Sequence, residues 1–163
     1  MTTKFEVERF TVTSSQSFDA VVTLFKAAVG RLDLAEFANK SKSLGHFSEL
    51  EQLIAEGVGK TGLMLFLELD HGAVLRKESG LDKPKIIRFV IGNPLIMKEM
   101  AKHVADAGSY APVTVLIDET DEGVRLSYDT MTSFLAPYGN EKANAVARDL
   151  DTKVEDLLRQ AAV

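Results

Sequence analysis

The segment GLMLFLELD, residues 62–70, decides the fold class because it has the pattern of a buried strand that ends in acidic residues. Its first half is apolar on both faces, which is typical of a strand in the middle of a sheet. In its second half the side chains alternate, so Glu68 and Asp70 share one face while Leu67 and Leu69 share the other. We therefore expect a central strand whose end reaches a polar region.

Four further segments are expected to be strands because apolar residues alternate along them: residues 4–13, 85–91, 113–118 and 124–128. The first changes phase once, which suggests a bulge. An acidic turn with a glycine joins the last two segments into a hairpin. Because turns often replace helices between neighbouring strands, the sequence predicts an α+β fold with an antiparallel sheet of about five strands, covered by helices on one side.

Helices are expected where apolar residues recur at intervals of three and four. Ser17 is a candidate N-cap for a helix whose apolar stripe runs from Phe18 to Leu32. Ser48, with Glu51 three residues later, predicts a second, shorter helix through a capping-box pattern.

Two more helices follow from asparagine caps. Asn93 precedes Pro94, and proline at the first helical position loses no hydrogen bond. Asn140 begins a C-terminal helix, residues 140–162, whose apolar residues repeat in alternating steps of four and three. This narrow seam, from Ala143 to Ala161, suits packing on a sheet or on a partner chain.

Length and composition limit the domain count and the partners. At 163 residues and 45% hydrophobic content, residues 1–163 are expected to form a single domain. The net charge of -5 disfavours nucleic acid and anionic membranes. The chain has no cysteine, and charges in its first ten residues leave no apolar run for a signal peptide or a spanning helix. These features predict a cytoplasmic protein without a disulfide.

Several segments together resemble a known family. They are the GLMLFLELDHG segment, the turn Gly92-Asn93-Pro94 and the proline-led strand at Pro112, and they resemble the family catalogued as domain of unknown function 302. The resemblance covers most of residues 5–130 and implies a curved antiparallel sheet with a TATA-binding-protein-like β-α-β(4)-α layout, and a homodimer. It implies no activity, substrate or cofactor. Relative to the shorter family pattern, residues 34–60 and 72–84 are interpreted as insertions.

Glu68, Asp70 and His71 form the most suggestive polar cluster in the sequence. The two carboxylates point the same way along the strand, and a histidine follows as the strand ends. Such a cluster suits acid–base chemistry, because a carboxylate can orient the imidazole and stabilise its protonated form. The alternative is a strand that simply ends in solvent. The remaining histidines lack metal-ligand spacing, so no metal site is predicted.

Asn93, Tyr110, Tyr128 and Asp129 complete the candidate ligand-binding residues. Asn93 opens a helix whose free N–H groups suit an anion, although capping alone explains the residue. The other three flank strand ends, where tyrosines line either pockets or the edge of a core.

The first functional hypothesis is a homodimeric module that binds a small ligand or a partner, without a cofactor. Common nucleotide, hydrolase and zinc-protease motifs are missing from the sequence, which favours binding over catalysis. The alternative is a metal-independent enzyme that uses His71 with Glu68 or Asp70 as an acid–base pair. A DNA-binding role, suggested by fold analogy alone, is disfavoured by the acidic charge.

Overall fold

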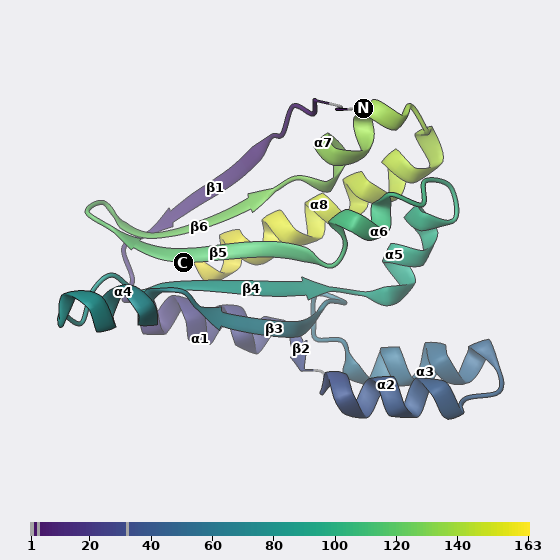
Figure 1. The fold of residues 1–163 in the computed structure, drawn as a ribbon, viewed down its shortest axis with the longest axis horizontal. Helices are drawn as coiled ribbons and strands as arrows, with labels where there is room; N and C mark the ends of the chain where they lie inside the picture. The colour runs from purple at the N-terminus through teal and green to yellow at the C-terminus, as the bar shows by residue number, and fades with distance from the viewer. Residues whose placement is uncertain (1, 3, 32) are drawn as a thin grey trace.

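A twisted open sheet forms the body of the protein in the computed structural model, which describes residues 2, 4–31 and 33–163 (Figure 1). Within those residues the sheet has six strands in the order β1-β6-β5-β4-β3-β2. The strands are β1 (Arg9–Ser14), β2 (Gly30–Arg31), β3 (Met64–Asp70), β4 (Ile86–Gly92), β5 (Val113–Thr120) and β6 (Gly123–Asp129). All neighbours pair antiparallel except β2, which runs parallel to β3.

One face of the sheet carries the core, because alternate side chains of the central strands are apolar. Opposite this face, the open face carries arginines, hydroxyls and aspartates from the same strands. The core side chains of the three central strands are Ile87, Phe89, Ile91, Val113, Val115, Ile117, Val124, Leu126 and Tyr128.

The helices cover the core face and one end of the sheet. In Figure 1, α1 (Phe18–Ala28) and α8 (Glu141–Ala161) lie behind the sheet, and α5 (Pro94–Ala101), α6 (Ala107–Tyr110) and α7 (Met131–Leu135) gather at one end. A short 3-10 turn, η1 (Ala136–Tyr138), follows α7. The opposite end carries α4 (Gly72–Ser79), while α2 (Leu34–Ser43) and α3 (Phe47–Gly57) form a hairpin that projects from the body.

The expected α+β class, with an antiparallel sheet and helices on one face, is confirmed. All five predicted strands are present, but the short parallel strand β2 makes a sixth among the described residues. The bulge was predicted in the wrong strand: β1 pairs with β6 without interruption, and the register shift lies in β3 between Leu65 and Leu67. This shift turns Leu67 to the open face, where it is 44% exposed.

The predicted helix caps are confirmed at three positions. Ser17, Asn93 and Asn140 accept hydrogen bonds from the backbone N–H groups of Ala20, Leu95 and Ala143, at 3.3, 2.8 and 3.0 Å. The first helix ends at Ala28, so its stripe is shorter than expected, and Leu32 lies outside the described residues.

The second predicted cap is wrong by two residues. α3 begins at Phe47, and the Glu49 carboxylate accepts the backbone N–H of His46 at 2.8 Å, so Glu49 takes the part expected of Glu51. The interpreted insertions contain helices that were not predicted, α2 and α4, because the first carries little apolar periodicity and the second is short. That they are insertions stays a prediction.

The C-terminal seam packs inside the chain. Ala143, Ala147, Leu150, Val154, Leu157 and Ala161 are all at most 3% exposed, and they belong to the core cluster behind the sheet. The sequence left open whether this seam packs on a sheet or on a partner chain. In the structure it packs toward the sheet of its own chain.

Candidate functional site

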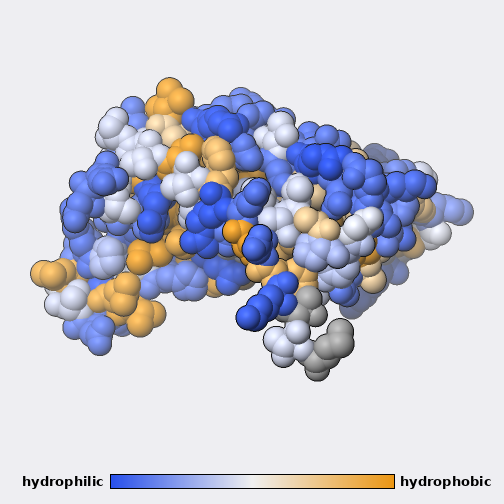
Figure 2. Space-filling model, turned by 90° about the horizontal axis from the view of Figure 1, so that it is seen from above, coloured by the Kyte–Doolittle hydropathy of each residue, from blue (hydrophilic) through white to orange (hydrophobic). Residues whose placement is uncertain are grey.

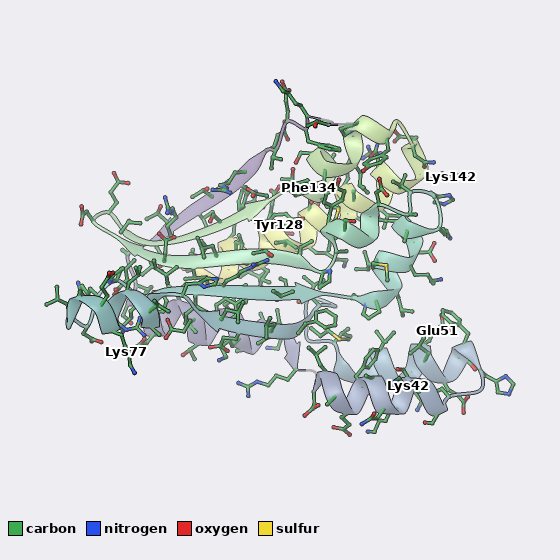
Figure 3. The ribbon with its side chains drawn as sticks, in the orientation of Figure 1. Lys42, Glu51, Lys77, Tyr128, Phe134 and Lys142 are labelled. Atoms are coloured by element: carbon green, nitrogen blue, oxygen red, sulfur yellow. The ribbon has the colours of Figure 1, made fainter. Side chains whose placement is uncertain are left out.

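The predicted site residues divide between opposite ends of the sheet. Glu68 and Asp70 pair with Phe89 and Ile87, near the start of β4, and His71 follows them. The other four lie where β4 and β6 end and β5 begins. Figure 3 marks the two ends with Phe134 on α7 and Lys77 on α4. The structure therefore divides the seven residues between two separate places on the sheet.

A cleft of about 380 Å³ opens on the polar face of the sheet, at the end beside α6 and α7. We call it the sheet cleft. Its floor comes from the open-face residues of the four strands β1, β6, β5 and β4, and α6 and α7 form its wall. The lining residues are Arg9, Arg88, Ser109, Tyr110, Pro112, Val113, Thr114, Leu116, Ser127, Tyr128, Asp129, Met131 and Phe134.

Arg88 is the central charged residue of this floor. It stands opposite Leu116 in the β4–β5 pairing, on the face away from the helices. One guanidinium nitrogen donates to the Thr114 hydroxyl at 3.0 Å. Within the described part of the chain Arg88 makes no ion pair, so most of its hydrogen-bond donors remain for solvent or a ligand.

Arg9 and Asp129 form the second charged element of the sheet cleft. They face each other in the β1–β6 pairing, and the guanidinium donates to both carboxylate oxygens at 2.6 and 2.8 Å. The Asp129 carboxylate raises the pKa of Arg9 through this hydrogen bond and through its charge. Because the pair is neutral overall, Arg88 leaves the cleft lining with one excess positive charge, in contrast to the acidic protein as a whole.

An aromatic pair forms the wall of the sheet cleft. The Tyr110 and Phe134 rings stack with their centroids 4.7 Å apart and 10° between their planes. The Tyr110 hydroxyl lies 3.2 Å from the Tyr138 hydroxyl, which donates to Asp106 at 2.7 Å. Because the Tyr138 proton goes to Asp106, Tyr110 is the donor within the tyrosine pair.

Tyr128 reaches the sheet cleft from below, but its ring belongs to the core. It is 1% exposed, and its hydroxyl donates to Asp151 of α8 at 2.6 Å. Asp151 also accepts the backbone N–H groups of Met131 and Thr132 at 2.7 and 3.0 Å. Burial, followed by the charge of Asp151, raises the pKa of Tyr128. This network fixes the start of α7, and with it the position of Phe134.

Asn93 lies in a separate, apolar pocket. Its side-chain amide donates to the carbonyl of Gly62 at 2.9 Å while its oxygen caps α5, so both ends of the side chain have structural partners. The pocket beside it has a volume of about 180 Å³ and lies between α5 and the adjacent strand ends.

The far end of the sheet gives Glu68 and Asp70 separate partners. Glu68 pairs with Lys26 of α1 at 2.5 Å. Asp70 binds Arg76 and accepts the backbone N–H of Ala73, at 2.7 and 2.9 Å, and the hydrogen bond from Arg76 lowers its pKa. No hydrogen bond joins the His71 side chain to either carboxylate in the described structure. The acid–base hypothesis stays a prediction, with less geometric support than the sheet cleft.

The described part of the chain contains neither a metal site nor a membrane-spanning helix. The described residues include no cluster of histidines and carboxylates that would hold an ion. Among the same residues, every helix is too short or too polar to cross a bilayer. Figure 2 shows a largely hydrophilic face with smaller hydrophobic patches.

Sequence reasoning missed the residue that dominates the sheet cleft. Arg88 lies between Ile87 and Phe89 in the strand expected at residues 85–91, so alternation alone puts it on the opposite face, but it was not among the candidate binding residues. The usable signal was a lone arginine on the outer face of a central strand. Phe134 gave no signal, because α7 has only five residues and begins almost directly after β6.

Comparisons with known proteins agree on one family. A family model described as "Domain of unknown function DUF302" matches residues 37–161. The chain is also similar to a crystal structure of an uncharacterised conserved DUF302 protein from Bacillus stearothermophilus, with a TM-score of 0.64 and 12% identity, over 94% of this chain and 97% of that one. At this identity the likeness supports the fold alone. Among curated proteins none matches the chain.

Proposed function

We propose that this protein, which belongs to the DUF302 family, binds a small organic anion in the sheet cleft. One observation carries the proposal: Arg88 lies on the floor of a 380 Å³ cleft, and no carboxylate of the described chain neutralises it. An arginine fork matches the geometry of a carboxylate or a phosphate. The ligand would supply the partner that the chain does not.

The other groups of the sheet cleft complement such a ligand. Ser109, Thr114 and Ser127 place hydroxyls on its lining, and hydroxyls donate to or accept from a bound anion. The Tyr110–Phe134 stack adds an apolar wall for the body of the molecule. A cleft that combines apolar walls with a few fixed polar groups is the usual form of a ligand site.

The test is the binding of butanoate, a minimal organic anion, followed by NMR titration at millimolar concentrations. We expect Arg88→Met to weaken binding at least about tenfold, since a charge-assisted hydrogen bond contributes about 1.5–3 kcal/mol. Arg31→Met is the matched control, because Arg31 is exposed on β2, outside the sheet cleft, and its loss changes the net charge equally. Equal binding by wild type and Arg88→Met, or no binding by wild type, would overturn the proposal.

The homodimer is also a proposal, and the α2–α3 hairpin supports it better than the C-terminal seam does. α2 buries none of its described residues, and Leu34 and Phe47 are 46% and 49% exposed. Lys42 lies on α2 and Glu51 on α3, and both extend from the hairpin in Figure 3. A two-fold axis would place the basic helix of one copy against the acidic helix of the other, so the surface is self-complementary.

Sedimentation velocity tests the dimer at micromolar concentrations. A sedimentation coefficient that corresponds to two copies is expected for the wild type. The double variant Leu34→Glu, Phe47→Glu should yield monomers, whereas Leu81→Glu, at an apolar residue just after α4 that is 67% exposed, should not. A wild-type monomer would remove the proposal.

A further inference from the structure

A second pocket lies beside the sheet cleft and has the opposite character. Its volume is about 180 Å³, and its lining is almost entirely apolar. Ile96, Met97 and Met100 contribute from α5, and Phe66 and Pro112 from the strand side. We call it the α5 pocket. The methionines make it adaptable, because thioether side chains conform to irregular shapes.

The backbone keeps the α5 pocket open at Gly92. A Cβ atom at this position would lie 3.2 Å from the Pro112 Cβ and 3.4 Å from Phe66 Cε2. Any side chain at this position would therefore press on two of the residues that line the pocket. Because glycine has no side chain, an apolar space remains at the end of β4.

The two cavities meet at the start of β5. Pro112 and Val113 line both of them. Along β4, the charged Arg88 lies in the sheet cleft while Gly92, two alternating positions further on the same face, lies in the α5 pocket. A polar site and an apolar one are thus arranged end to end across Pro112.

We propose that the sheet cleft and the α5 pocket together bind an anionic amphiphile, with its head on Arg88 and its alkyl tail beside Met97 and Met100. This inference rests on the proposed function and specifies its ligand class. An apolar cavity of about 150 Å³ is enough for a benzene molecule. The α5 pocket therefore accommodates a tail segment of about six carbons, and the ligand is a medium-chain carboxylate or an equivalent alkyl anion.

Methionine methyl groups report on each cavity separately in the unmodified protein. Met131 lines the sheet cleft, whereas Met97 and Met100 line the α5 pocket. With methyl-labelled methionine, butanoate should shift the Met131 signal alone. Octanoate should shift Met131, Met97 and Met100 together.

Affinity gives the second readout. Each buried methylene adds about fourfold to the affinity. From butanoate to octanoate we therefore expect a gain of at least about tenfold, even when part of the tail stays in solvent. Octanol, which has the tail without the charge, should bind more weakly than octanoate, and Arg88→Met should remove this difference.

Met97→Trp fills the α5 pocket and should weaken octanoate binding about tenfold while it leaves butanoate binding unchanged. His103→Trp is the matched control, because His103 is exposed just after α5 and lines neither cavity. Ile96→Trp repeats the test if Met97→Trp does not fold.

Two outcomes would overturn the inference. Octanoate that binds no tighter than butanoate and shifts only Met131 would leave the anion site intact and remove the tail site. If octanol binds as tightly as octanoate and shifts Met97 and Met100 alone, the α5 pocket binds apolar molecules independently of Arg88, and the two cavities do not form one site. Failure of butanoate to bind would instead contradict the proposed function.

Discussion

The two ends of the sheet place charged residues in opposite situations. At the α4 end, Glu68 and Asp70 are each neutralised by a cation of the same chain, Lys26 and Arg76. At the cleft end, Arg88 carries a charge that the described chain leaves unpaired. The acidic cluster is the more conspicuous feature of the sequence, but ion pairs within the chain neutralise its carboxylates. Arg88, in contrast, remains able to bind an anion.

The two ends also differ in how they are fixed. The α4 end depends on surface ion pairs, and Asp70 is 45% exposed at its side chain. The cleft end depends on the buried Asp151, which holds Tyr128 and the first residues of α7. A buried network positions its members more strictly than solvent-screened pairs do, as a ligand site requires. Three variants test this difference.

The largest effect is expected from Asp151→Ala. The substitution leaves the buried Tyr128 hydroxyl and the Thr132 N–H without an acceptor, and the Met131 N–H keeps only the Tyr128 hydroxyl. We therefore expect a loss of about 3 kcal/mol in the free energy of unfolding. Asp149→Ala, at an exposed position on the same helix, is the control and should change stability by less than about 0.5 kcal/mol. Chemical denaturation measures both. A small effect at Asp151 would mean that the two ends are fixed alike.

An intermediate effect is expected from Asp129→Asn, and its sign is informative. Removal of the carboxylate releases Arg9 and raises the positive charge of the sheet cleft, so butanoate should bind about three- to tenfold more tightly. NMR titration measures the affinity, with Asp121→Asn in the β5–β6 turn as the charge-matched control. Weaker binding in Asp129→Asn would mean that the carboxylate itself contacts the ligand.

The smallest effect is expected at the α4 end. Asp70→Asn should cost at most about 1 kcal/mol of stability, because exposed ion pairs are screened. Since Arg76 lowers the pKa of Asp70 in the folded state, this contribution is complete above the ordinary value of 3.8 and is lost as the pH falls through the lower folded-state value. Thermal unfolding of the wild type and of Asp70→Asn, at pH values from about 2 to about 7, measures how this stability difference changes with pH. A change in butanoate affinity at neutral pH would contradict the separation of the two ends.

The sequence predicted the elements of the fold well because their signals are local. Alternation in the five strands and asparagine caps before Pro94 and Glu141 depend only on neighbours along the chain. β2 escaped because two residues show no alternation. The bulge was misplaced because it depends on the pairing of Leu65 and Leu67 with β4, which the sequence of one strand does not contain.

The site was harder to predict because it depends on contacts between distant segments. Arg88, Tyr110 and Phe134 come from separate elements and meet only when β4, β5 and α7 are in place. Three predicted residues, Tyr110, Tyr128 and Asp129, do line the sheet cleft. The grouping with His71 failed because sequence proximity to a strand end does not say which end of the sheet that strand reaches.

The most direct test of the account is an amide NMR map of the wild-type protein during titration with octanoate. We expect the largest shifts on residues 92–100, 110–116 and 127–134 and on the side chain of Arg88, while residues 68–76 stay unchanged. Shifts concentrated on residues 68–76, with the sheet cleft unaffected, would contradict it and would favour a site built on Glu68, Asp70 and His71.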